Sequence, residues 1–325
     1  MSLMTSLDVL KVNNSEELVG LIEDVVAEIP EIDFFAASPV EKNSYQTLTL
    51  DGLPSTAFRE TGTLREFQTG TLGTRQVACK YLDASWTLEQ AVAQQSDWGE
   101  DFAKALQQRT HLKSAFYTLA KQIWRGVAND ANGFVGLNAF VDAVLDEDSG
   151  NRSMVVRANA DAAGSDGSTV YAVRTGIDSC QLAWGSKGAF DEGEVVEQLL
   201  YDRDASGETP RTSGAWHYAQ KLGGWVGLQV TSKFAAGKIE GLSATSGLTD
   251  DLLYQLLERF PASMKPQGLF MSKRSWAQLR RSRTAYNPIG APAPYVDEFE
   301  GVKIYVSDAI SNAETYSATG ADSGT

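Results

Sequence analysis

Hydrophobic side chains recur with helical spacing through one long stretch in the first half of the chain. Steps of three and four residues place them on a single stripe of a helix that begins near position 97 and ends near position 126. The members of this stripe are Phe102, Ala105, Leu106, Leu112, Phe116, Leu119, Ile123 and Val127. Asp97 and Glu100 have the spacing of a capping box, and Gly126 is typical of a helix end. About thirty residues at about 1.5 Å each predict a rod about 45 Å long.

A second helical stripe precedes the first and ends at Pro30, which cannot continue a helix. Its apolar positions are Leu18, Leu21, Ile22, Val25, Val26 and Ile29. Between Glu16 and Asp33 the chain carries seven acidic residues and no basic one. The pattern fits either a solvated acidic face over a buried apolar one, or an N-terminal arm that docks on a basic patch of another subunit.

Residues 40–85 have the alternation of extended strands rather than a helical period. Tyr45, Thr47 and Thr49 alternate with Gln46, Leu48 and Leu50, and turn residues and glycines follow. A lone two-stranded ribbon is marginally stable in water. We therefore expect this ribbon to pack either on its own core or on a neighbouring molecule.

The rest of the chain reads as a strand-rich region followed by a helix, a strand, a short helix and a last strand. The strand-rich region spans residues 150–240, and a helix opened by Thr249 closes before Pro261. A strand at 268–271 precedes a helix that Ser272 can cap, and residues 301–307 form the final strand. From Asn312 the tail is small and polar, so on its own it is expected to be disordered.

Composition limits the kind of protein this can be. The chain has 325 residues, 42% of them hydrophobic, which is enough for two domains. No apolar run is long enough to span a membrane, and the first residues lack the features of a secretory signal. The net charge of −14 argues against a surface built to grip nucleic acid.

One basic run stands out against this acidic whole. It contains no acid, and its members are Lys273, Arg274, Arg280, Arg281 and Arg283. It fits an exposed helix face or a complement to an acidic surface on another copy. Binding of nucleic acid is a third interpretation, and a weaker one because base-stacking aromatic residues do not interleave with the run.

Candidate chemistry is sparse. His111 and His217 are the only histidines, and no serine lies in a nucleophile-elbow motif. Cys79 and Cys180 lie far apart within strand patterns, which favours packed thiols in a reducing compartment. The acidic residues near Asp142 do not have the spacing of a calcium loop. We therefore predict no catalytic residue, no cofactor and no metal; a hydrolase using Ser213 and His217 and a surface adhesion module are the competing readings.

The order of these parts resembles the tailed-bacteriophage major capsid proteins of the HK97 type. The resemblance covers residues 15–311 and is carried by the order of elements together with four local segments. These segments are GLPSTAFRETGTL (52–64), VYAVRTGIDSCQLAWGSKG (170–188), GGWVGLQV (223–230) and FEGVKIYVSDAIS (299–311).

The resemblance implies an α+β, HK97-like major capsid fold with an N-terminal arm, an E-loop β-hairpin, a peripheral (P) domain with a long spine helix, and an axial (A) domain. The boundaries it implies are 1–39 for the arm, 40–85 for the E-loop, 86–150 for the P domain with its spine helix, 151–262 for the A domain, 263–311 for a return to the P domain and 312–325 for the C-terminal tail.

A capsid role is the function that this resemblance implies. The chain would assemble with itself as hexamers and pentamers into an icosahedral head that encloses double-stranded DNA without binding it specifically. Its location would be the virion after assembly in the host cytoplasm, with separate scaffolding, portal and cement proteins as further partners. An encapsulin-type shell that holds a protein cargo is the alternative. The candidate contacts between subunits are Glu23, Asp24, Glu28, Arg59, Arg274, Arg280 and Arg281.

Overall fold

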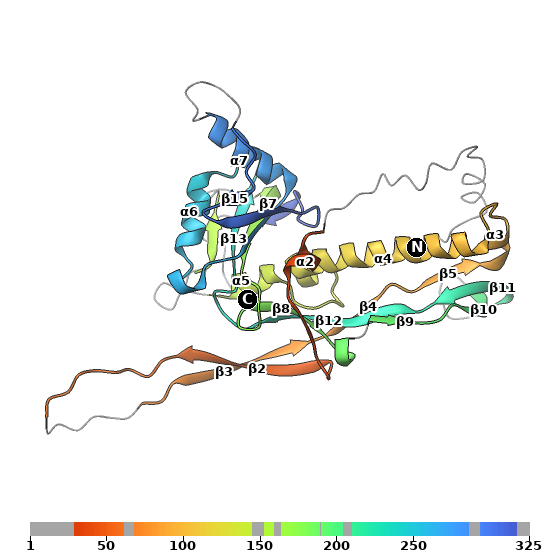
Figure 1. Ribbon diagram of the computed structural model, residues 1–325, viewed down its shortest axis with the longest axis horizontal. Coiled ribbons are helices and arrows are strands. Elements are labelled where there is room, and N and C mark those ends of the chain that lie inside the picture. The colour runs from red at the N-terminus through yellow and green to blue at the C-terminus, as the bar shows by residue number, and fades with distance from the viewer. Residues whose placement is uncertain are drawn as a thin grey trace.

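The predicted long helix is present as α4 (Glu100–Arg125), 26 residues long, and it runs through the middle of the molecule (Figure 1). Its start differs from the prediction: the N-cap residue is Gly99, with a φ of +87°, which has no side chain to cap the helix. The predicted capping box at Asp97 is therefore wrong, because a left-handed residue that favours glycine sets the entry of the chain. The computed structural model describes residues 29–61, 68–144, 153–158, 164–188, 190–203, 210–285 and 293–316.

Two sheets run alongside α4 in Figure 1. The first has the order β1-β8-β12-β4, with β9 also paired to β12, and the second has the order β10-β11-β5. Their strands are β1 (Ala37–Pro39), β4 (Lys80–Asp83), β5 (Trp86–Glu89), β8 (Cys180–Trp184), β9 (Phe190–Glu192), β10 (Val196–Arg203), β11 (Pro210–Gln220) and β12 (Leu222–Val230). A short helix, α3 (Gln90–Gln94), joins β5 to the segment before α4.

A third sheet lies at the C-terminal end of α4 and has the order β15-β16-β14-β7-β13-β6, with β17 also paired to β7. Its strands are β6 (Val155–Arg157), β7 (Gly164–Val173), β13 (Ala236–Leu242), β14 (Gly268–Met271), β15 (Glu298–Phe299), β16 (Val302–Val306) and β17 (Glu314–Tyr316). The helices that accompany it are α5 (Leu137–Ala143), α6 (Asp250–Glu258) and α7 (Lys273–Ala285). This seven-stranded sheet and its helices form the upper left part of Figure 1.

The strands of residues 151–262, expected to form one A domain, are divided between different sheets in the structure. Residues 180–230 supply strands to the sheets beside α4, where β12 pairs with β4. Residues 268–306 supply β14 and β16 to the seven-stranded sheet, where β14 pairs with β7. The local pattern of apolar positions does not show which distant strands pair, so it cannot predict how the strands are divided among the sheets.

Other local predictions are confirmed. The Thr249 side chain accepts a hydrogen bond from Leu252 N and caps α6, while Ser272 Oγ accepts one from Ser275 N at the start of α7. The C-terminal tail was expected to be disordered on its own, and the part of it that forms β17 (Glu314–Tyr316) is not on its own, because it pairs with β7. The N-terminal helical stripe that ends at Pro30 lies outside the described residues, apart from its last two positions.

An aromatic cluster joins α4 to the seven-stranded sheet. Trp124, in the last turn of α4, is 1% exposed and stacks on Tyr171 of β7, with 4.7 Å between ring centroids. Its ring also lies 4.9 Å from Phe270 of β14 and 6.0 Å from Phe35. Large aromatic rings bury much apolar area, so this cluster dominates the contact between helix and sheet.

The turn after α4 is built on close backbone approach. Gly126 has a φ of +57°, and a Cβ on Gly136 would lie 2.4 Å from Gly126 N. Within the same turn the buried Gln122 side chain donates to Phe134 O at 2.7 Å and accepts from Asn129 Nδ2 at 3.0 Å. These contacts fix the direction in which the chain leaves the helix.

Replacing Gly136 by alanine is expected to lower the free energy of unfolding by about 1–3 kcal/mol, because the added methyl group meets backbone atoms that cannot move independently. Urea unfolding of the unassembled chain measures this change. Gly52→Ala is the matched control, since its Cβ would meet its nearest neighbour at 3.5 Å, an ordinary contact. Equal stability of the two variants would show that the turn tolerates the extra atom.

Candidate interface for assembly

The most exposed apolar surface of the described chain lies on a hairpin that projects from the body. Its strands are β2 (Ser44–Gly52) and β3 (Thr71–Ala78), which pair from Ser44↔Ala78 to Gly52↔Thr71. Figure 1 shows the hairpin at the lower left, extending past the body of the molecule. The expectation of a long extended ribbon in residues 40–85 is confirmed.

The hairpin has two faces of different character, because side chains alternate along each strand. On one face Thr49 and Val77 are buried against the same chain. On the other face Leu48, Leu50 and Leu72 are 69%, 61% and 63% exposed. Leu50 and Leu72 are direct cross-strand partners, so these leucines form one continuous apolar strip. We call these three residues the leucine strip.

The leucine strip continues toward the tip of the hairpin. Leu53 and Phe58 follow β2, and their side chains are also exposed. Isolated exposed apolar residues are ordinary on soluble proteins, but a contiguous group marks an interaction surface. The predicted contacts include none of these residues, although leucine at alternate positions of a Thr-rich strand is a signal that marks Leu48 and Leu50.

The root of the hairpin is anchored to its own chain. Cys79 N donates to Asn43 O at 2.8 Å, and Tyr45 Oη donates to Gln229 Oε1 of β12 at 2.5 Å. Burial raises the pKa of Tyr45 to about 12 and also raises the pKa of the Cys79 thiol. Farther out, the Arg75 guanidinium lies 4.9 Å from the centre of the Phe140 ring of α5. The root is therefore tied to its own chain, while the leucines of the outer face are exposed among the described residues.

A buried carboxyl group holds the root of the N-terminal arm. Glu31, in α2 (Glu31–Phe34), is fully buried, and its Oε1 accepts hydrogen bonds from Trp124 Nε1 at 2.7 Å and from Ser307 Oγ. Burial raises the pKa of Glu31, and nearby Asp308 adds to this effect. The arm therefore leaves the body at the joint between α4 and the seven-stranded sheet. The predicted contact residues Glu23, Asp24 and Glu28 lie outside the described residues.

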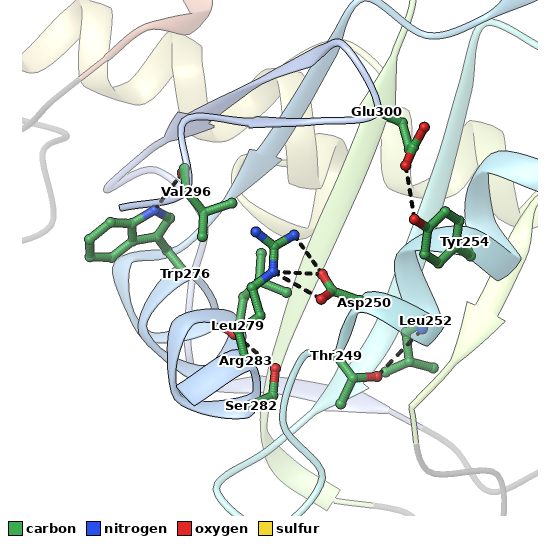
Figure 2. Close-up of polar contacts among 10 residues, drawn as sticks. All are labelled: Thr249, Asp250, Leu252, Tyr254, Trp276, Leu279, Ser282, Arg283, Val296 and Glu300. Carbon is green, nitrogen blue, oxygen red and sulfur yellow. Dashed lines mark hydrogen bonds and ion pairs between the residues drawn. The ribbon is translucent and has the colours of Figure 1, made fainter. Parts of the chain in front are cut away.

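The basic run is on α7, and most of its members serve their own chain. Arg274 donates to Asp166 O at 2.7 Å and to Leu242 O at 2.9 Å. Figure 2 shows Arg283 forming a forked ion pair with Asp250 at the start of α6.

Arg280 is likewise engaged within the chain. Its Nε donates to Ala293 O at 2.9 Å, and its guanidinium lies 4.3 Å from the centre of the Tyr295 ring. Arg280 and Arg274 therefore have structural partners in their own chain, which the run of charges in the sequence could not reveal.

Arg281 and Arg59 are the predicted basic contacts with the greatest exposure. Arg281 lines a groove of about 460 Å³ between α7 and the segment that leads from β13 to α6. Arg59 lies beyond β2, on the stretch that leads toward the tip of the hairpin. The structure does not bring Arg59 and Arg281 together within one chain, since Arg59 lies in the connection between β2 and β3 and Arg281 lies on α7.

The residues considered for catalysis do not form a catalytic arrangement. Ser213 and His217 are four residues apart on β11, a separation of about 13 Å along a strand, too far for a proton relay. His217 Nδ1 instead lies 2.9 Å from Ala215 O. Cys79 and Cys180 are both buried and free, in agreement with the prediction of packed thiols.

The described part of the chain has neither a candidate metal site nor a helix suited to span a membrane. Its histidines, cysteines and carboxylates form no cluster that could hold a metal ion. None of its helices combines the length and the apolar character needed to cross a membrane.

Comparisons with known proteins identify the fold. No known protein family model matches the chain, and no curated protein matches it in sequence. Among solved structures, a chain from the near-atomic cryo-EM structure of bacteriophage Epsilon15 matches over 98% of both chains, with a TM-score of 0.72 and 13% identity. This chain has the HK97-type major capsid fold. In the terms of that fold, the β2–β3 hairpin is the E-loop and α4 is the spine helix.

Two other shells are among the structural matches. The bacteriophage JBD30 capsid decorated with minor capsid protein trimers matches over 95% of this chain and 99% of that one, with a TM-score of 0.49 and 13% identity. The SrpI encapsulin complex from Synechococcus elongatus matches over 74% and 95%, with a TM-score of 0.41 and 7% identity.

Replacing Glu31 by glutamine is expected to flatten the pH dependence of stability. The pKa of Glu31 is raised in the folded chain, so the folded state holds the proton more tightly than the unfolded state does. Its contribution is fully present below the unfolded pKa and is lost as the pH rises through the folded pKa. Chemical unfolding of the unassembled chain between about pH 4 and pH 8 measures the slope.

Glu258→Gln provides the control for this slope, because Glu258 is exposed on α6. It should keep the pH dependence of the parent chain. If Glu31→Gln also kept it, the buried carboxyl group would not be the source of the dependence.

Proposed function

We propose that this chain is a major capsid protein that assembles as hexamers and pentamers into an icosahedral phage head around double-stranded DNA. The observation that carries the proposal is the E-loop, whose inner face packs on its own chain while the leucine strip stays exposed. A second copy of the chain is the natural cover for a surface that every copy presents. Many modest contacts closed by symmetry make a shell that dissociates very slowly.

The charge of the chain fits enclosure of DNA without specific contacts. A net charge of −14 gives the whole chain the same sign as the DNA backbone, so close and sequence-specific binding is disfavoured. The location that follows is the virion, after assembly in the host cytoplasm. Separate scaffolding, portal and cement proteins are the further partners of such a shell. No observation favours a protein cargo over DNA as the content.

The double substitution Leu50→Ser with Leu72→Ser is expected to prevent or weaken shell formation without unfolding the chain. Both side chains are more than 60% exposed in the single chain, so their removal costs little intramolecular packing. Burying a leucine is worth about 1.5–3 kcal/mol, so losing two raises the concentration needed for assembly by at least about tenfold. Electron microscopy and sedimentation of the purified chain measure the closed particles.

Thr74→Ala is the matched control for the leucine strip. Thr74 lies opposite Leu48 on the same outer face, and its removal takes away no large apolar group. The control and the parent chain should both form closed particles. Normal shells from the double variant would refute the role of the strip, and a parent chain that forms no particles either alone or with its scaffolding protein would refute the capsid function.

The acidic N-terminal arm is the partner whose charge fits the groove at Arg281 on another copy. Glu23, Asp24 and Glu28 lie within a segment that has no basic residue, and Arg281 is an exposed cation in that groove. Opposite charges of this kind set the register of docking and its salt dependence. Arg59 on the exposed E-loop remains a candidate contact of the same type.

Arg281→Glu is expected to raise the concentration needed for assembly roughly fivefold at low salt, because it replaces an attraction between exposed charges by a repulsion. The difference should shrink at high salt because exposed charges are screened. Lys273→Glu is the control, since Lys273 is exposed on α7 and does not line the groove. The same assembly for Arg281→Glu and the parent chain at low salt would remove Arg281 from the interface.

A further inference from the structure

The C-terminal segment is attached to the fold along β7, a strand that lies inside the seven-stranded sheet between β14 and β13. β17 pairs antiparallel with the first half of β7, with Glu314 opposite Gly167 and Tyr316 opposite Gly164. The second half of β7 is already paired on both sides, by β13 and by β14. The core of the sheet is therefore complete without β17, which covers only the part of β7 that projects beyond it.

The side chain of Glu314 enters a polar cavity of about 240 Å³ at the joint between α4 and the sheet. Its Oε2 accepts a hydrogen bond of 2.5 Å from Thr169 Oγ1, and Thr169 is 4% exposed. The cavity is bounded by the end of α4 through Arg125, and by residues of α5, β7, β13 and β17. A single carboxyl group of the tail thus lies among groups from several elements.

The floor of this cavity is a preorganised charge network. Lys238 of β13 is 2% exposed, and its Nζ lies 2.7 Å from Asp142 Oδ1, 2.9 Å from Glu240 Oε2 and 2.7 Å from Asn138 Oδ1. Glu240 also pairs with Arg157 at 2.9 Å. These groups hold one another in place within the main body, so the site does not need the tail for its shape.

The charged groups that line this cavity with Glu314 are Arg125 of α4, Asp142 of α5, and Lys238 and Glu240 of β13. Burial raises the pKa of Glu314, Glu240 adds to this rise, and the cations Arg125 and Lys238 together with the Thr169 hydrogen bond oppose it. Because the raised pKa belongs to the docked state, docking takes up a proton. Docking is therefore favoured at low pH and weakens as the pH rises through the docked pKa.

We propose that this cavity and the projecting half of β7 form a binding site for an extended acidic peptide, and that the chain's own C-terminal segment is its detachable ligand. The tail adds a strand to the projecting half of β7 and places one carboxyl group in a prepared polar cavity. The segment acts as a strap across the joint between helix and sheet, independent of whether the chain forms shells.

A peptide of residues 310–325 labelled with a fluorophore tests the site on the full chain. In the Glu314→Ala chain the strap loses its carboxyl group, so the peptide should occupy the vacated site. In the parent chain the tail competes at a high effective concentration, so the apparent affinity should be at least about tenfold weaker. A peptide that itself carries Glu314→Ala should bind the Glu314→Ala chain at least about tenfold more weakly than the native peptide.

Hydrogen exchange of the same chains locates the effect. Amides of residues 164–167 should exchange faster in Glu314→Ala and in Thr169→Val, which removes the hydroxyl donor and keeps the side-chain shape. Amides of β12 serve as the internal control for an intact fold. Unchanged exchange at 164–167 in both variants would overturn the proposal, as would equal peptide binding to the parent and Glu314→Ala chains, or no binding to an opened site.

The pH profile separates a carboxyl-specific site from simple strand pairing. The native peptide should bind the Glu314→Ala chain more tightly near pH 5 than near pH 8. A Glu314→Gln peptide can accept the same hydrogen bond but does not titrate, so it should show a smaller pH dependence. Identical profiles for the two peptides would exclude the cavity as the receptor for this carboxyl group.

Discussion

The packing of Trp124 against the seven-stranded sheet is the contact on which the rest of the structure depends. It stacks on Tyr171 and approaches Phe270, and its indole nitrogen donates to Glu31. One side chain at the end of α4 therefore ties together the helix, the sheet and the root of the N-terminal arm. A helix of 26 residues transmits any change of angle at this end into a large displacement at the other.

This joint makes the exposed hairpin useful. The hairpin that carries the leucine strip contacts both parts of the molecule that meet at this joint. Its root is hydrogen-bonded to β12 of the sheet beside α4, and Arg75 lies over Phe140 of α5, which accompanies the seven-stranded sheet. A flexible hairpin would lose conformational entropy when it met a neighbour, whereas a held one has lost most of it already. The rigidity of the body is thus what allows a strip of three leucines to contribute to assembly.

Local patterns in the sequence predicted the elements far better than their pairing. Leucine and phenylalanine spacing marked α4, and alternation in residues 45–50 marked the hairpin, because both periods are set by the backbone itself. The predicted helix start at Asp97 is wrong because Gly99, with a positive φ, is the N-cap residue, and a capping-box pattern does not take such a residue into account. The grouping of β12 with β4 could not be seen, because pairing between distant segments depends on the whole core.

The pattern of charges along the sequence was the poorest guide to which residues are exposed. A run of arginines without acids suggested one exposed basic face, yet Arg274 and Arg280 bond to carbonyl oxygens and Arg283 pairs with Asp250. Guanidinium groups have several donors and long apolar stems, so they serve as internal fasteners as readily as surface charges. Of the run, Lys273 and Arg281 keep the exposure that an exposed helix face predicts, and Arg281 lines the groove beside α7.

Both ends of the described chain place a carboxyl group at the same joint, fully buried in Glu31 and partly buried in Glu314. Glu31 enters from the N-terminal side beside Trp124, and Glu314 enters from the C-terminal side beside Arg125. Burial raises the pKa of each, so each disfavours the packed joint as the pH rises. An apolar residue at either position would avoid that cost. The two carboxyl groups therefore give the joint polar contacts that weaken as the pH rises, beside the aromatic packing of Phe35 and Trp124, which does not depend on pH.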